Sequence, residues 1–170
     1  MRLVDNPRFR LRPGTTLRYR GEQDGLPGAE VFRVTRRSRT ILGVRTTIVP
    51  DHVFERGRRA GRRAARHLYA AHPAVGRSFR QEFLKGRAED HFGIVGVHAT
   101  LSVPGARSRR ALETREWSPL EPGVRDQKLY ARGIGTVLER TLGGGDERRQ
   151  LVSIEPQRGV RIHEPSARPY

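Results

Sequence analysis

The chain has 170 residues, enough for one domain with a modest core, and 35% of them are apolar. Lysine and arginine outnumber aspartate and glutamate by 34 to 18, which gives a net charge of +16. Because the sequence has no cysteine, disulfides, thiolate metal sites and cysteine nucleophiles are excluded.

Almost all of the positive charge is arginine, since Lys85 and Lys128 are the only lysines. One interpretation is phosphate binding, because the planar guanidinium fork suits phosphate. The other is coding bias in a GC-rich genome, which the spread of arginines through the whole chain favours. Under either interpretation, the charge predicts nonspecific attraction to nucleic acid, other anionic polymers or an anionic membrane surface.

The start of the chain and its hydropathy bear on localisation. No apolar run approaches the roughly 18 residues that span a bilayer. The opening "MRLVDNPRF" has no apolar segment of the kind found in a signal peptide. As it stands, the sequence predicts a cytoplasmic protein.

The first third of the chain predicts irregular structure followed by strands. Residues 1–13, rich in arginine with two prolines, are expected to be an irregular lead-in. Leu17 and Tyr19 alternate with arginines, which predicts a short strand with one buried face. The β-branched stretches 29–41 and 43–54 predict two more strands.

The segment 57–72, "GRRAGRRAARHLYAAH", is helical by pattern. On a helical wheel its alanines and Leu68 gather on one side, and Pro73 would end the helix. Its arginines occupy the opposite arc, and they are Arg58, Arg59, Arg62, Arg63 and Arg66.

β-character returns in the second half. The clearest strand signal is a strict alternation that places five apolar residues on one face: Val95, Val97, Ala99, Leu101 and Val103. Further strands are predicted at 75–86, 109–117, 127–131, 134–142 and 148–155. The sequence therefore predicts a mainly β fold, a curved antiparallel sheet or incomplete barrel of about eight strands with one helix. We expect a single domain over 1–155 and a flexible tail over 156–170.

Two motifs contain residue types that occur in chemical sites. The glycines of "YARGIGTVLE" lack the G-x-G-x-x-G spacing and precede a strand signal, so Gly133 and Gly135 predict a bend rather than a phosphate cradle. Glu89, Asp90 and His91 are adjacent, but solvated carboxylates that pair with arginines explain them better than a metal or acid–base site. We therefore expect no catalytic residue, metal or cofactor.

Several stretches, in order, resemble a family of uncharacterised bacterial, often actinobacterial, secreted or lipoprotein-like β-sheet domains. They are "RPGTTLRYRGE", "RQEFLKGRAED", "ETREWSPLEPG" and "KLYARGIGTVLE". The family pattern is similar to "PGTTWxYEGE", "RQEYxxGEAED", "TxEWTPLEPG" and "YYAPGVGLVxE". This chain departs from it in its extra arginines, in segment 57–72 and in the missing signal peptide. The resemblance implies an extracytoplasmic domain and no established activity.

These observations predict a non-enzymatic binding or envelope-associated domain. We expect the inner face of the curved sheet to hold an apolar or amphipathic small ligand. The residues expected to line that site are Leu17, Tyr19, Val97, Leu101 and Trp117. The alternative is a cytoplasmic nucleic-acid-binding protein that uses the five arginines of segment 57–72.

Overall fold

The computed structural model describes residues 12–41, 44–47, 49–55, 58–61, 73–80, 85–87 and 89–156. These residues form strands, turns and loops, and none of them is helical. In chain order the strands are β1 (Thr16–Gln23), β2 (Leu26–Arg33), β3 (Ser38–Ile41), β4 (Val44–Thr47), β5 (Asp51–Glu55), β6 (Arg58–Gly61), β7 (Ser78–Arg80), β8 (His91–Val103), β9 (Ala106–Trp117), β10 (Arg125–Ala131), β11 (Gly135–Gly143) and β12 (Arg148–Glu155).

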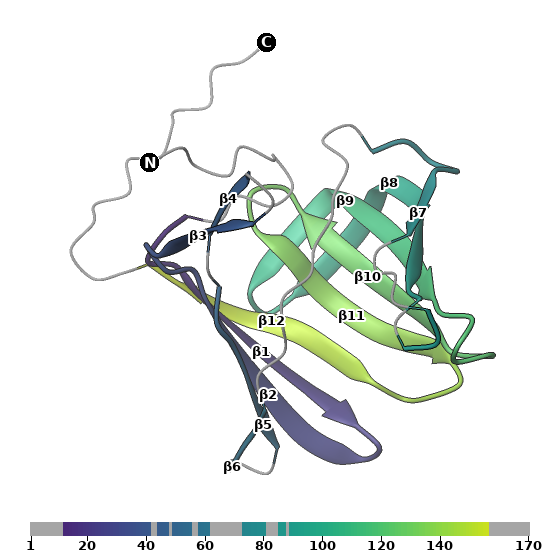
Figure 1. Ribbon diagram of the computed structural model, residues 1–170, viewed down its shortest axis with the longest axis horizontal. Coiled ribbons are helices and arrows are strands. Elements are labelled where there is room, and N and C mark those ends of the chain that lie inside the picture. Colours follow the sequence, from purple (N-terminus) through teal and green to yellow (C-terminus); the bar gives the residue numbers. More distant parts are fainter. Residues whose placement is uncertain are drawn as a thin grey trace.

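Ten strands form one antiparallel sheet in the order β6-β5-β2-β1-β12-β11-β10-β9-β8-β7, and β3 pairs with β4 in a separate hairpin. The sheet curves strongly, so that its β2–β5 end stands at a steep angle to its β8–β10 end (Figure 1). The predicted curved antiparallel sheet is therefore confirmed.

The number of strands differs from the prediction because two expected strands are each interrupted. The stretch 29–41 divides into the end of β2 and the whole of β3, and the stretch 43–54 divides into β4 and β5. Pro50 lies just before β5, where its carbonyl oxygen accepts a hydrogen bond of 3.1 Å from Arg33 N–H. Proline has no N–H to continue a pairing, so a strand breaks readily at this position.

The helix predicted over 57–72 is wrong at its start. Residues Arg58–Gly61 form strand β6, which pairs with β5 through Phe54 and Arg59. Pairing with an exposed sheet edge satisfies backbone groups that a marginal, glycine-containing helix would leave to water. Residues 62–72 lie outside the described part of the chain.

The strongly alternating stretch Ile94–Val103 lies in β8, as predicted, but its side chains do not share one face throughout. Val95 is 44% exposed, whereas Leu101 and Val103 are buried. The register between β8 and β9 shifts at three places from Ile94 to Leu101. Each bulge adds an unpaired residue, which resets the alternation and bends the strand.

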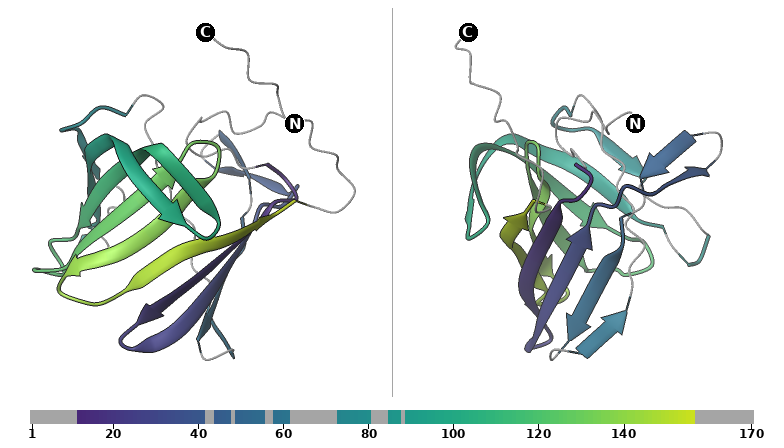
Figure 2. Two further views of the ribbon diagram at one scale, coloured as in Figure 1. Left: turned by 180° about the vertical axis from the view of Figure 1, so that it is seen from behind. Right: turned by 90° about the vertical axis from the view of Figure 1, so that its left-hand side faces the viewer.

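This bending carries the end of the β8–β9 hairpin to a distant strand. The hairpin extends past the β10–β11 turn and crosses over toward β12 (Figure 2, left). There Gly105 N–H donates to the Leu151 carbonyl oxygen at 3.0 Å. A Cβ at residue 105 would lie 2.8 Å from Leu151 Cγ, so only glycine permits this close contact.

The core consists of two apolar clusters. The larger gathers residues of seven strands, namely Leu17, Tyr19, Phe32, Leu101, Val103, Ala111, Leu129, Ala131, Val137 and Leu151. The smaller contains Phe92, Ile94, Leu112 and Tyr130. Leu129 and Tyr130 are neighbours on β10, and consecutive side chains of a strand point to opposite faces. The middle of the sheet is thus buried on both sides.

The glycine-rich turn between β10 and β11 has the predicted conformation. Gly133 and Gly135 have φ angles of 79° and 106°, in the region that only glycine adopts readily. Ile134 N–H, between them, donates to the Ala131 carbonyl oxygen at 3.2 Å. The motif is therefore a structural bend between two strands.

Candidate functional site

A cleft of about 200 Å³ lies beside the turn that joins β1 to β2. Residues of β1, β2, β5 and β12 line it, together with the end of the loop before β12. Its apolar lining comes from Leu26, Ala29, Val53 and Phe54. Its charged lining comes from Glu22, Asp24, Glu30, Glu147, Arg148 and Arg149. The cleft therefore combines apolar and ionic surface, as ligand sites commonly do.

Two glycines that pair across β1 and β2 give the cleft its space. Gly21 lies opposite Gly28, so neither strand places a side chain at this position. A Cβ at Gly21 would lie 2.0 Å from the Arg148 carbonyl oxygen, because β12 approaches closely. A Cβ at Gly28 would meet only the Phe54 carbonyl oxygen, at 3.6 Å. Gly21 is thus required by packing, whereas Gly28 simply leaves room.

Arg149 forms the ionic wall of the cleft. Its Nη1 lies 2.6 Å from Glu30 Oε2, and its Nη2 forms a short hydrogen-bonded ion pair with Glu139. Glu147 Oε1 lies 3.8 Å from the same Nη2. Glu30 is only 6% exposed, and a carboxylate buried to this extent requires a paired cation.

The ion pairs continue away from the cleft across three more strands. Lys128 Nζ lies 3.1 Å from Glu139 Oε1 and 2.6 Å from Glu116 Oε2. Lys128 pairs in register with Glu139, which in turn pairs with Arg149. Charged side chains from β9, β10, β11, β12 and β2 therefore form one row, which we call the ion-pair row: Glu116, Lys128, Glu139, Arg149 and Glu30.

The row perturbs the titration of its members. Burial alone would raise the pKa of Glu139, but attraction to Lys128 and Arg149 and their hydrogen bonds lower it to about 2. Burial also tends to lower the pKa of Arg149, yet its carboxylate neighbours raise it above the ordinary value. Glu116 has a raised pKa, because burial outweighs the attraction of Lys128. Glu139 and Arg149 are therefore ionised and paired with each other at neutral pH.

The rim of the cleft carries more negative than positive charge. Four carboxylates line it, against the two guanidinium groups of Arg148 and Arg149. Two of the carboxylates, Glu22 and Asp24, are exposed. This local excess stands out in a chain whose net charge is +16.

The residues expected to bind an apolar ligand occupy separate places. Leu17, Tyr19 and Leu101 are buried in the larger core cluster, where Tyr19 also donates a hydrogen bond of 2.9 Å to a backbone carbonyl oxygen of β11. Val97 packs against the smaller cluster. Trp117 stacks on His91 with the ring centres 5.6 Å apart. The structure does not bring these five side chains onto one surface, and their role in binding stays a prediction.

The structure describes two of the five arginines expected to form the alternative, nucleic-acid-binding site. Arg58 and Arg59 belong to β6, and the other three, at 62, 63 and 66, lie outside the described residues. Nucleic-acid binding through them stays a prediction. Among the described residues, no group of three or more side chains is arranged to hold a metal ion.

Sequence reasoning missed the cleft and the ion-pair row. A signal for the cleft exists in "YRGEQDGLPGAEV", where Gly21 and Gly28 flank the turn symmetrically within strand patterns. Isolated glycine inside a strand indicates close approach of another backbone or a ligand. The row could not be found in this way, because Glu30, Lys128 and Arg149 are far apart in sequence and only the strand register aligns them.

The described part of the chain is thus an open, curved antiparallel sheet of ten strands with a cleft at one end. The chain is similar in fold to one solved structure, a "putative exported protein with YmcC-like fold" from Bacteroides fragilis NCTC 9343. It shares 11% sequence identity with a TM-score of 0.56, over 85% of this chain and 96% of that one. At this identity the likeness concerns the fold alone.

No protein-family model matches the chain, and no curated protein matches it either. Within the described residues, nothing helical is long and apolar enough to cross a membrane.

Proposed function

We propose that this protein is a non-enzymatic binding domain of the bacterial cell envelope. In this proposal the cleft beside the β1–β2 turn holds a small amphipathic ligand whose head group is positively charged. The proposal keeps the expected class of an apolar or amphipathic ligand but moves the site to this cleft, which is lined by none of the five side chains expected to bind it.

The composition of the cleft is the main observation that supports this ligand class. Leu26, Val53 and Phe54 offer apolar surface to a hydrocarbon portion. The excess of carboxylates on the rim offers a favourable position for a cation. The rest of a chain with charge +16 repels cations, so a cationic ligand would be directed to this cleft specifically.

The ion-pair row supports a binding role over a catalytic one. Each member of the row that faces the cleft is already paired: Glu30 with Arg149, and Arg149 also with Glu139. General acid–base catalysis needs a group that is free to exchange a proton with substrate. A satisfied network of this kind instead fixes the shape of the site before the ligand arrives.

The envelope location rests on two supports. The family that the sequence resembles consists of secreted or lipoprotein-like domains. The solved structure with the same fold carries the description of an exported protein. Detection of the protein in the envelope fraction of its native cells tests this part, and recovery in the cytosol alone would contradict it.

The ligand class can be tested with two detergents that share a decyl tail. Isothermal titration calorimetry would compare decyltrimethylammonium, which is cationic, with decyl maltoside, which is uncharged, both below their micelle concentrations. We expect measurable binding of the cationic probe and at least about tenfold weaker binding of the uncharged probe. Equal affinity for the two would contradict the role of the carboxylates.

A pair of glycine variants tests the location. Gly28→Leu should fill the cleft and abolish binding. Gly143→Leu is the matched control, because a Cβ there also meets a backbone carbonyl oxygen at 3.6 Å but lies on β11 outside the cleft. Unchanged affinity in Gly28→Leu, or an equal loss in both variants, would show that the cleft is not the site.

A pair of charge variants tests the rim. Glu22→Gln with Asp24→Asn removes two exposed carboxylates of the cleft. Glu121→Gln with Asp90→Asn removes two exposed carboxylates that do not line it. Only the first pair should weaken binding of the cationic probe.

A further inference from the structure

A second hollow lies at the opposite end of β1 from the cleft. It has a volume of about 410 Å³ and is bounded by the start of β1, the residues that follow β2 and the end of β12. Its polar lining comes from Thr16, Arg33, Thr35, Arg36 and Glu155. This end of the sheet therefore gathers two arginines and two threonines around one hollow.

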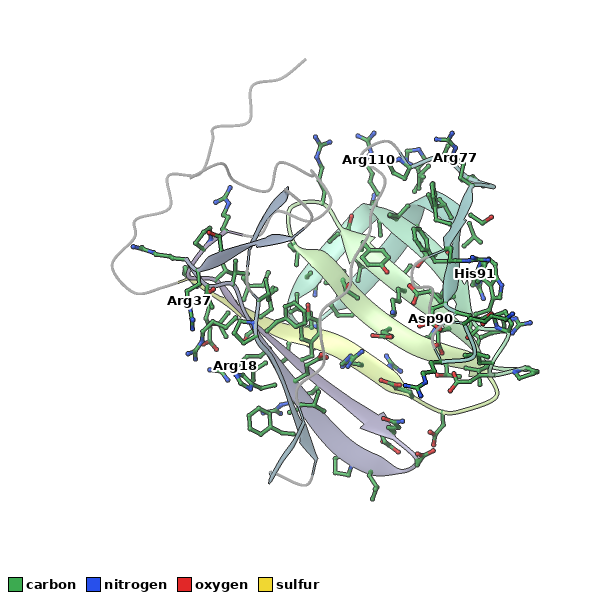
Figure 3. All side chains as sticks on the ribbon, viewed as in Figure 1. Arg18, Arg37, Arg77, Asp90, His91 and Arg110 are labelled. Carbon is green, nitrogen blue, oxygen red and sulfur yellow. The ribbon has the colours of Figure 1, made fainter. Side chains whose placement is uncertain are left out.

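The arginines of this hollow are available to a ligand. Arg33 and Arg36 are both exposed, and neither forms an ion pair with a carboxylate whose side chain the structure describes. Arg37 is adjacent and also exposed. Figure 3 shows Arg18 and Arg37 at this end of the molecule, and Asp90 and His91 toward the other. The field at the hollow is thus strongly positive.

Glu155, the one carboxylate among the described lining residues, does not oppose an anion. Glu155 receives two hydrogen bonds from Arg18, at 2.6 Å from Nε and 3.2 Å from Nη2. This fork-to-carboxylate geometry uses both oxygens of Glu155 and neutralises its charge. The Glu155–Arg18 pair therefore leaves the positive charge of Arg33 and Arg36 uncompensated.

Hydroxyl groups complete the hollow. Thr35 Oγ1 accepts a hydrogen bond of 3.2 Å from Arg37 N–H, which fixes the backbone turn that carries Arg36 and Arg37. Thr16, at the start of β1, contributes a second hydroxyl to the lining. Guanidinium forks and hydroxyl donors are the groups that recognise phosphate oxygens in proteins.

We propose that this hollow binds a phosphate group. Arg33 and Arg36 would each direct a guanidinium fork at phosphate oxygens, and Thr16 would donate a hydroxyl hydrogen bond. The phosphate belongs either to a phospholipid head group or to a free phosphate ion. The site is at the other end of β1 from the cleft and does not depend on the proposed function of the cleft.

The test uses the whole chain and two charge-matched double variants. Arg33→Gln with Arg36→Gln removes the proposed ligands. Arg107→Gln with Arg109→Gln removes two exposed arginines of β9 and lowers the net charge equally. Broadening of the ³¹P resonance of inorganic phosphate, at constant ionic strength in chloride, reports binding. Circular dichroism confirms that both variants remain folded.

We expect the first variant to bind inorganic phosphate about tenfold more weakly and the second to bind it as the wild type does. Arg33→Lys with Arg36→Lys keeps the charge but removes the planar forks, and it should lose most of the affinity as well. Equal losses in the two glutamine variants, or no loss in either, would overturn the proposal, because net charge would then explain the binding.

A second arm distinguishes the source of the phosphate. Vesicles of phosphatidylglycerol in phosphatidylcholine are sedimented with the protein, in the presence and absence of inorganic phosphate. If the protein cosediments, and both inorganic phosphate and the Arg33→Gln, Arg36→Gln double substitution abolish this, the phosphate belongs to a lipid head group. Binding of inorganic phosphate with no cosedimentation supports a free phosphate ion. Cosedimentation that neither of them reduces would count against the hollow.

Discussion

Arg149 of β12 forms an ion pair of 2.6 Å with Glu30 of β2, although β1 lies between these two strands in the sheet. The contact is possible because β1 contributes Gly21 at the position in register with Arg149. No side chain at that position separates the guanidinium from the carboxylate. The pair thus connects strands that do not share backbone hydrogen bonds.

Replacement of Arg149 should destabilise the protein severely. Arg149→Met would leave Glu30 and Glu139 buried without this cation, and the removal of one partner from a buried ion pair costs about 3 to 5 kcal/mol. Arg148→Met is the control, because Arg148 is exposed and adjacent. It should change the free energy of unfolding by no more than about 0.5 kcal/mol. Urea unfolding followed by circular dichroism measures both, and equal stabilities would contradict the importance of the ion-pair row.

The ion-pair row also predicts a loss of stability in acid. The pKa of Glu139 is about 2 in the folded protein, below its ordinary 4.5. A lowered pKa stabilises the fold above pH 4.5, and this contribution, on the order of 3 kcal/mol, is lost as the pH falls toward 2. Glu116 acts in the opposite direction, because its raised pKa favours the folded state once its carboxyl is protonated.

Two variants separate these opposing effects. Glu139→Gln should be less stable at neutral pH and should lose less further stability in acid than the wild type. Glu116→Gln should lose more in acid, because the compensating protonation is removed. Urea unfolding across the acidic range measures these slopes. Parallel curves for the wild type and Glu139→Gln would show that Glu139 does not carry the pH dependence.

The paired glycines of the cleft should respond differently to the same substitution. Gly21→Ala places a Cβ 2.0 Å from the Arg148 carbonyl oxygen, so β12 must move and stability should fall by about 2 kcal/mol or more. Gly28→Ala meets its nearest neighbour at an ordinary 3.6 Å and should be neutral or slightly stabilising. Thermal unfolding of the two variants tests this asymmetry. A larger loss of stability in Gly28→Ala than in Gly21→Ala would contradict the conclusion that packing requires Gly21 and not Gly28.

The contact between the β8–β9 hairpin and β12 should depend on Gly105. Gly105→Ala brings a methyl group within 2.8 Å of Leu151 Cγ, which should push the hairpin away and break the hydrogen bond to Leu151. Hydrogen exchange of the backbone amide at residue 105 should then accelerate toward the rate of an open loop. Retained protection would indicate that the hairpin adapts without leaving β12.

Local patterns predicted much of this fold. Alternation located most strands, including β8, β9 and β12, and the glycines of the β10–β11 turn were assigned to a bend. Residues 58–61 misled the prediction, because their arginine and alanine pattern suits a helix when considered alone. The free edge of β5 imposed extended backbone on Arg58–Gly61. Local preference is a weak guide wherever a neighbouring strand offers unsatisfied hydrogen-bonding groups.

The site was harder to predict because it depends on register. Glu30, Lys128 and Arg149 are separated by tens of residues, and each is an ordinary charged residue within a strand pattern. A shift of one residue in any pairing would turn one of these side chains to the other face. The pairing register exists only in the folded sheet, so no single stretch of sequence reveals the ion-pair row.

The open sheet ends in two very short strands, and this has a consequence for solubility. Of the described strands, the outermost are β6, with four residues, and β7, with three. A long, flat edge would offer a row of unpaired amide and carbonyl groups to another molecule and would promote aggregation. However, β7 covers only His91–Gly93 of β8, so most of the β8 edge has no described strand beside it. The three register shifts of β8 bend this edge, and a bent edge is a poor template for pairing between molecules. We therefore expect these bends, together with the shortness of β6 and β7, to keep the molecule dispersed at high concentration.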